Sequence, residues 1–130
     1  MAKVILFAAA LLILGALIGN GLERYTVSRH KHTRAVMNLA AFHFDRLSNA
    51  AKGGQCATFV AERERLFRIS DELLDAFPKA YAQDAEFHKR ADALRSAVHP
   101  DNGATGECST AAADTKKIDD ACDDCHKEYN

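Results

Sequence analysis

The stretch Cys122-Asp123-Asp124-Cys125-His126 lies close to the C-terminal end of the 130-residue chain. Two cysteines three positions apart, followed at once by a histidine, have the spacing of a c-type haem attachment site. In that chemistry the two thiols add to the two vinyl groups of one haem, and the adjoining imidazole binds the iron as its proximal ligand. The stretch therefore predicts one covalently bound haem c, and with it a fold that must enclose this group.

Two haem-free interpretations of the same stretch remain as alternatives. A Cys-x-x-Cys pair can be half of a zinc site or a redox dithiol of the thioredoxin type. A zinc site needs a second pair of ligands, which Cys56 and Cys108 do not form. A thioredoxin-type motif opens a helix after a strand, whereas no strand-like run precedes Cys122. Both interpretations therefore fit less well than haem attachment.

The composition indicates a single helical domain. The chain holds only seven glycines and two prolines, and it is rich in residues that favour helices. A net charge of -1 indicates no general attraction to nucleic acid. No nucleophile is paired with a base and no phosphate-binding loop is present, so we expect no enzymatic activity.

Residues 1–22 are predicted to be a signal peptide or a membrane anchor, and residues 23–130 to be the haem domain. Lys3 is the only charged residue of the first segment, and residues 4–18 are almost wholly apolar, as in a secretory signal. No Ala-x-Ala cleavage site follows, and about 19 uncharged residues are long enough to span a bilayer. We therefore favour an uncleaved anchor over residues 4–22.

The haem motif also predicts the compartment. Haem attachment at this kind of site takes place on the periplasmic side in bacteria, and four cysteines suit an oxidising compartment. Arg24, Arg29, Lys31 and Arg34 follow the apolar segment, and the positive-inside rule alone would leave the domain in the cytoplasm. Because that rule is statistical and the chemistry is not, we expect the domain to face the periplasm, with the basic run lying against anionic lipid or in solvent.

Four amphipathic helices are predicted, over residues 23–51 and 56–76, from just after Phe77-Pro78 to residue 98, and over residues 109–129. Glycine at positions 53 and 54, Phe77-Pro78 and the run from His99 to Gly103 separate them. Such helices with short loops predict an all-α, antiparallel up-down-up-down four-helix bundle preceded by a hydrophobic helix. The predicted inner positions are Thr33, Met37, Ala40, Ala41, Phe44 and Leu47; Phe59, Val60, Arg63, Leu66, Phe67, Ser70, Leu73, Leu74 and Phe77; Tyr81, Asp84, Phe87, Ala91, Leu94 and Val98; and Ala111, Thr115, Ile118, Cys122, Cys125 and Tyr129.

Met37 is the predicted distal ligand of the iron. In an antiparallel bundle Met37 lies roughly 20 Å and His126 roughly 25 Å from the same end. A thioether opposite an imidazole suits electron transfer, although Met also fills gaps in cores. His30, His32 and His43 are rival ligands, with His43 turned off the face of Met37. We expect the remaining two histidines, His88 and His99, to be ordinary surface or loop residues.

The chain resembles the class II c-type cytochromes, the cytochrome c-prime-like family, over roughly residues 33–129. The resemblance rests on the run from Cys122 to Tyr129 (Cys-Asp-Asp-Cys-His-Lys-Glu-Tyr) and on two segments of the first helix, Arg34-Ala-Val-Met37 and His43-Phe44-Asp45-Arg46. It implies a four-helix bundle with the haem site near the C-terminus, and it implies that Arg34 pairs with a haem propionate. Asn130 and Asp120 stand where the family often has arginine and glycine.

The resemblance also implies what the haem would do. Members with Met at the position of Met37 look like low-spin electron carriers that serve a redox partner protein. High-spin members with a non-ligating residue there bind small gases such as NO and CO, which is the alternative function. Acidic residues near the motif, Asp119, Asp120, Asp123, Asp124 and Glu128, would suit a basic partner or simply a solvated face. Members often form homodimers through their first two helices.

Cys56 and Cys108 are predicted to form a disulfide. One opens the second helix and the other precedes the fourth, and in an up-down-up-down bundle these two loops share one end. A bond there would close a long loop and stabilise the fold. Two unpaired thiols are the alternative.

Overall fold

The computed structural model describes the backbone of residues 2–77, 81–99 and 108–129, and the side chains of residues 14–16, 18, 31–77, 81, 83–99 and 109–129. Within these ranges the chain is helical and has no strand. The α-helices and the two 3-10 turns are α1 (Ala2–Lys52), α2 (Cys56–Ala76), η1 (Tyr81–Gln83), α3 (Ala85–Val98), η2 (Cys108–Thr110) and α4 (Ala111–Tyr129).

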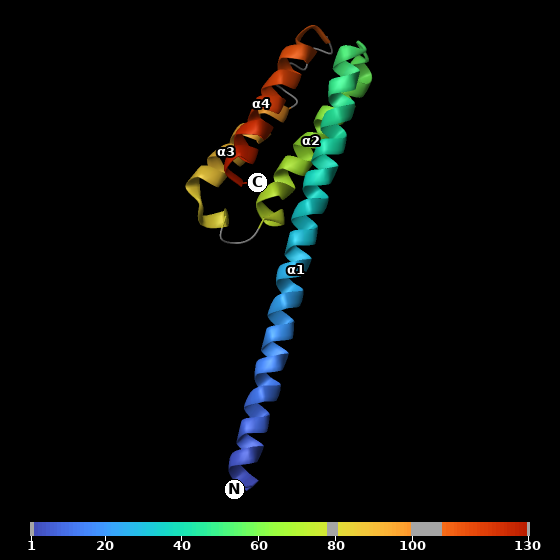
Figure 1. Cartoon of the computed structure of the whole chain (residues 1–130). Coiled ribbons are helices and arrows are strands. Elements are labelled where there is room, and N and C mark those ends of the chain that lie inside the picture. Colours follow the sequence, from blue (N-terminus) through green and yellow to red (C-terminus); the bar gives the residue numbers. More distant parts are fainter. Residues whose placement is uncertain (1, 78–80, 100–107, 130) are drawn as a thin grey trace.

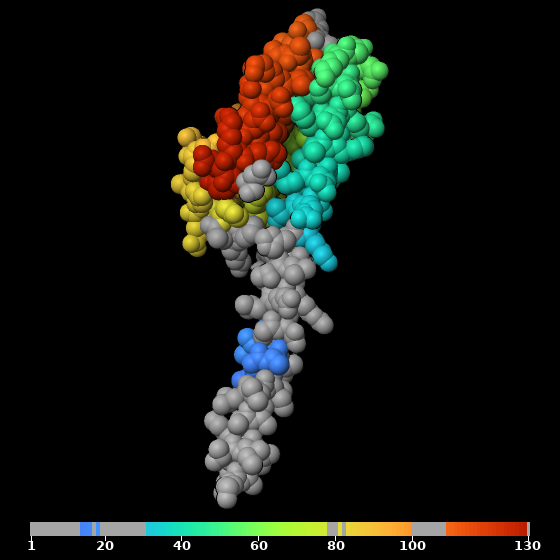
Figure 2. All heavy atoms as spheres, in the orientation of Figure 1, coloured from blue at the N-terminus to red at the C-terminus, as the bar shows by residue number. Residues whose placement is uncertain are grey.

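The four helices form the predicted bundle. α1 packs mainly on α2 and α4 mainly on α3, while α2 also meets α3 and α4 also meets α1. Figure 1 shows α1 continuing well past the other helices toward the N-terminus. Figure 2 shows the atoms of α4 alongside those of α1 within the bundle. The all-α, antiparallel four-helix fold predicted from the sequence is confirmed.

The glycine pair ends α1 where the sequence indicated. Gly54 has a φ of 64°, a conformation that glycine adopts without steric cost. The turn is closed by backbone hydrogen bonds of 2.9 Å from Gly53 N to Asn49 O and from Gln55 N to Ala50 O, which satisfy carbonyls at the helix end. α2 then begins at Cys56 and ends at Ala76, as predicted.

The third helix starts later than predicted. Asp84 is its N-cap, and its carboxylate accepts hydrogen bonds from the backbone of Glu86 at 2.9 Å and Phe87 at 3.4 Å. A side-chain acceptor at this position starts a helix, so the segment ahead of it forms the separate turn η1 instead of extending α3. Similarly, α4 begins at Ala111 after η2, two residues beyond the predicted start.

The buried core falls into two clusters along the bundle. One cluster comprises Leu47, Ala50, Phe59, Leu66, Val98, Ala111 and Ile118. The other comprises Val36, Ile69, Leu73, Ala76, Phe77 and Phe87. Ala40 of α1 and Leu94 of α3 pack against both clusters. These two residues therefore mark the place where one buried cluster gives way to the other.

Three of the predicted inner positions are on the surface. Val60 is 53% exposed, and Ala41 and Leu74 are also exposed. Each lies at the edge of a helical stripe, where one residue too many was assigned to the inner face. The other described members of the four stripes are buried or half-buried.

A buried carboxylate joins α1 to α2. Glu62 is 1% exposed. Its Oε2 lies 2.6 Å from Nδ1 of His43, and its Oε1 accepts hydrogen bonds from Arg46 at 2.8 Å and Arg65 at 2.6 Å. Burial raises the pKa of Glu62, but the hydrogen bonds from His43 and Arg46 and the charges of Arg65 and Arg46 outweigh it and lower the pKa below its ordinary value.

A second buried pair joins the other helices. Arg63, a predicted inner residue, donates to Asp114 at 3.3 Å and to the carbonyl oxygen of Ala97 at 3.3 Å. Thr110 also donates to Asp114 at 2.9 Å. The guanidinium therefore links α2 to both α3 and α4, and a buried charge of this kind is tolerated because it is paired.

Most side chains of the predicted leader, residues 1–22, lie outside the described residues. The backbone of residues 2–22 belongs to α1, which runs on without a break into the bundle, and the division into a leader and a haem domain stays a prediction. In the part of the chain that the structure describes, no helix is both long and apolar enough to cross a membrane.

Candidate functional site

A cavity of about 430 Å³ lies where the core divides. Its walls come from all four α-helices and from Phe77, the residue that follows α2. The residues lining it are Thr33, Arg34, Met37, Ala40, Leu73, Phe77, Phe87, Arg90, Ala91, Leu94, Cys122, Cys125, His126 and Tyr129. A second cavity of about 190 Å³ adjoins it and reaches further into the bundle, toward Phe44, Leu66 and Ile118. Met37, Ala40, Leu73, Leu94, Cys122 and His126 line both.

The three residues of the motif share one face of α4. Positions three and four apart are neighbours on a helix surface, so Cys122, Cys125 and His126 all reach the same cavity. The two cysteines are half-buried free thiols, and the His126 side chain is exposed. The structure therefore brings the motif to the cavity wall with its imidazole at the edge of the bundle.

Met37 approaches the same space from α1. Its side chain is half-buried and lines both cavities. The structure thus places the predicted distal ligand and the predicted proximal ligand around one cavity, although they come from the first and the last helix.

Burial keeps the two thiols protonated. It raises the pKa of Cys122 to about 11, and the neighbouring Asp119, Cys125 and Asp123 add to this shift. Burial also raises the pKa of Cys125, against the charge of Arg90. A redox dithiol needs the opposite, a thiol with a lowered pKa. Among the described side chains, no three His, Cys, Asp or Glu residues come together as a metal site.

Two arginines line the cavity from different helices. Arg34 of α1 is exposed and borders the cavity, as its predicted contact with a carboxylate requires. Arg90 of α3 was missed by the sequence analysis. It lies three residues after Phe87 and four before Leu94, so helical periodicity is the signal that could have placed it beside the inner stripe.

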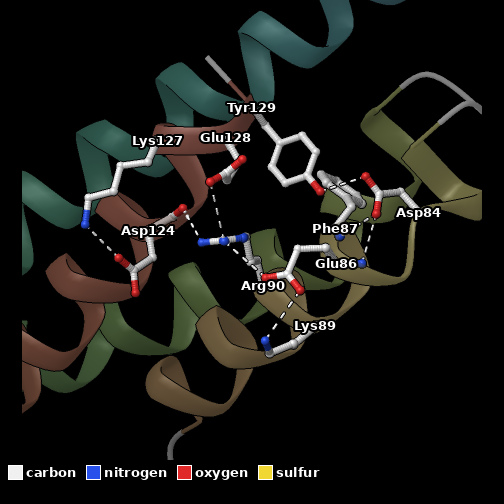
Figure 3. Close-up of polar contacts among 9 residues, drawn as sticks. All are labelled: Asp84, Glu86, Phe87, Lys89, Arg90, Asp124, Lys127, Glu128 and Tyr129. Carbon is white, nitrogen blue, oxygen red and sulfur yellow. Dashed lines mark hydrogen bonds and ion pairs between the residues drawn. The ribbon is translucent and has the colours of Figure 1, made fainter.

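Aromatic rings form one end of the cavity. The ring of Tyr129 packs edge-on against Tyr81 and Phe87, with centroids 5.5 Å and 5.2 Å apart. Its hydroxyl donates to Asp84 at 2.7 Å (Figure 3). Burial and this hydrogen bond raise the pKa of Tyr129 to about 12, while the bond from Tyr129 lowers the pKa of Asp84.

The two rival histidines whose side chains the structure describes, His32 and His43, line neither cavity. His43 is engaged with Glu62 and does not line the cavity, which confirms that it faces away from Met37. His32 is exposed, and the side chain of His30 lies outside the described residues. His99 packs edge-on against Phe67, with centroids 5.0 Å apart.

Cys56 is held in a disulfide. The side chain of Cys108 lies outside the described residues, so the Cys56–Cys108 pairing stays a prediction. Cys56 opens α2 and Cys108 opens η2, in agreement with the positions on which the prediction was based.

The bundle is similar to a solved structure. Cytochrome c' from Rubrivivax gelatinosus superimposes with a TM-score of 0.63 and 23% sequence identity, over 75% of this chain and 90% of that one. This likeness shows the fold. No protein-family model and no curated protein matches the sequence.

Proposed function

We propose that the chain is a c-type cytochrome of the cytochrome c-prime-like class, with one haem c covalently held in the 430 Å³ cavity. The observation that carries the proposal is the convergence of Met37, Cys122, Cys125 and His126 on that one cavity. Cys122 and Cys125 would form the thioether bonds, and His126 and Met37 would be the axial ligands.

The cavity walls suit such a group. Leu73, Phe77, Phe87, Ala91 and Leu94 present apolar side chains, as a largely apolar macrocycle requires. The Nε atom of the cavity-lining Arg90 is buried and has no hydrogen-bond partner among the described residues. A carboxylate-bearing group in the cavity would offer it an acceptor, and the exposed Arg34 would take a second carboxylate at the rim.

The residues around the cavity suit electron transfer. When bound, the haem iron supplies a one-electron couple whose potential is raised by a Met/His ligand pair. The apolar walls would limit the contact of water with this centre, which would further raise the reduction potential of a bound haem. His126 lies at the exposed edge, where a redox partner protein can come close.

The surroundings support a periplasmic electron carrier that meets a basic partner. Asp119 and Asp123 border the deeper cavity and are exposed, so their charges would steer a positively charged protein toward the haem edge. The disulfide at Cys56 suits an oxidising compartment. The leader would tether the domain to the membrane or direct its export.

A gas-binding protein with five-coordinate iron is the second candidate. It is favoured by the 190 Å³ cavity beside Met37, because this cavity would leave room for a diatomic ligand if Met37 only shielded the iron. Both candidates attach the haem through the same residues, and they differ in whether the Met37 thioether binds the iron.

An optical spectrum of the full chain, matured in a host that attaches haem c, tests the proposal. We expect a Soret band and low-spin bands that include a methionine–iron band, and we expect Met37→Leu to abolish the latter. Leu39→Ala, an exposed position on the same helix, is the control and should leave the spectrum unchanged. A high-spin spectrum that shifts with carbon monoxide would establish the second candidate, and the absence of a Soret band would contradict both.

A further inference from the structure

Arg90 occupies a central place in the contacts of α3 with α4. It lies on α3, lines the 430 Å³ cavity, and has a side chain that is only 22% exposed. Its Nε atom is buried without a partner in the described part of the chain. Burying an unpaired N–H group is unfavourable, so in the described chain the contacts of the terminal nitrogens must offset this cost.

Those terminal nitrogens contact the part of α4 that carries the haem motif. One donates to the backbone carbonyl oxygen of Asp124 at 2.5 Å, and Asp124 lies between the two motif cysteines. The other lies 3.1 Å from Glu86 on its own helix and 3.9 Å from Glu128 on α4. Figure 3 shows the guanidinium between these acidic side chains. Arg90 is thus fixed to α3 by Glu86 and attached to α4 on either side of His126.

A second contact holds the C-terminal end of α4. The hydroxyl of Tyr129 donates to the N-cap residue Asp84 at 2.7 Å, and that carboxylate is itself fixed by the first turn of α3. The stretch from Asp124 to Tyr129 is therefore attached to α3 at both of its ends. Cys125 and His126 lie between the two attachments.

We infer that Arg90 is a positioning residue for the haem ligand His126, acting through the backbone of Asp124. The inference rests on the proposed function. A main-chain carbonyl cannot move without moving the residues beside it, so a rigid donor at Asp124 fixes where Cys125 and His126 meet the cavity. This would restrict the orientation of the imidazole, much as outer contacts orient the ligands of other metal sites.

The experiment compares Arg90→Gln with Arg95→Gln in the full chain carrying haem. Arg95 lies on the same helix and pairs with Asp71 at 2.9 Å, but it does not line either cavity, so the control removes a matched charge and ion pair. The readouts are the midpoint reduction potential and the circular dichroism of the Soret band, which reports how the porphyrin sits among its neighbours. We expect Arg90→Gln to shift both readouts and Arg95→Gln to shift neither.

Arg90→Lys keeps the charge but offers no planar fork with which to hold Asp124, Glu86 and Glu128 together. It is expected to shift both readouts in the same direction by less, and it serves the test if the glutamine variant does not fold. Readouts for Arg90→Gln and Arg90→Lys equal to those of Arg95→Gln, in a protein that carries haem, would overturn the inference and leave the proposed function standing. A wild-type chain without a Soret band would overturn both.

Discussion

Met37 of α1 and His126 of α4 line the same two adjoining cavities of the bundle. The two residues belong to the first and the last helix, which meet because the fold returns the chain antiparallel to its start. In the proposed cytochrome this thioether and this imidazole would be the two axial ligands of the haem iron. The following predictions concern this pair and the contacts that hold the bundle around it.

Replacing Met37 by leucine should lower the reduction potential and allow carbon monoxide to bind the ferrous protein faster. Leucine keeps the apolar volume beside Ala40 but cannot bind iron, so the sixth position would open. Redox titration and stopped-flow mixing with carbon monoxide measure the two effects. Equal potentials and equal rates for the variant and the wild type would show that Met37 is only a core residue.

Replacing Glu62 by glutamine should destabilise the fold by about 1–3 kcal/mol near neutral pH, because three donors lose a charged, buried acceptor. Glu64→Gln is the control. Glu64 pairs with Arg68 at 3.2 Å on the surface, and exposed pairs of this kind contribute about 0–1 kcal/mol. Urea unfolding measures both differences.

The contribution of Glu62 to the stability of the fold should also depend on pH. Its pKa is lower in the folded chain than the ordinary value of 4.5, so its contribution is complete above that value and is lost as the pH falls through the lowered pKa. The difference in the free energy of unfolding between the wild type and Glu62→Gln should therefore become smaller at acidic pH. A gap that stays constant from neutral to strongly acidic pH would contradict the hydrogen-bonded carboxylate.

Replacing Tyr129 by phenylalanine should lower the thermal midpoint and remove a titration from the alkaline range. The pKa of Tyr129 is raised from 10.0 to about 12 in the folded chain, so its contribution to stability is complete below pH 10 and is lost as the pH rises through about 12. Tyr81→Phe is the control, because it also removes one tyrosine hydroxyl from the same aromatic group and keeps the ring that packs edge-on against Tyr129. Equal midpoints for the two variants would rule out a role for the Tyr129–Asp84 bond.

The helix boundaries were predictable where the local signal is strong. Gly53 and Gly54 end α1, and Phe77 with the proline after it ends α2, so residues 56–76 were assigned correctly. The start of α3 was missed because Asp84 was counted as an inner residue of the stripe, and only the structure shows its carboxylate capping the helix. The composition changes sharply after residue 22, where the leader is predicted to end, but α1 continues through this point, so no helix boundary coincides with that change.

The meeting of the motif residues and Met37 at one cavity was predictable, but the side chains that contact the motif were not. Cys122, Cys125 and His126 have a fixed spacing, and Met37 follows from helical periodicity, so all four could be assigned to one site. The contact of Arg90 with the motif was not predictable, because its acceptor is a backbone carbonyl oxygen of another helix. The same holds for Glu62, which looks like a surface residue until its partners on α1 are known.

The disulfide at Cys56 should join it to Cys108 and contribute about 2–4 kcal/mol. Mass spectrometry of the unreduced protein should find no thiol at either position that can be alkylated. A Cys56→Ser/Cys108→Ser variant should unfold at lower urea concentration, with its haem spectrum retained. Alkylation of both residues without reduction would end this prediction.

Covalent haem attachment at the motif is tested most directly by the intact mass of the full chain, matured in a host that attaches haem c and then denatured. The account predicts a mass increased by one haem in the wild type and no such increase in Cys122→Ala/Cys125→Ala. A wild-type chain whose mass equals that of the polypeptide alone would contradict it.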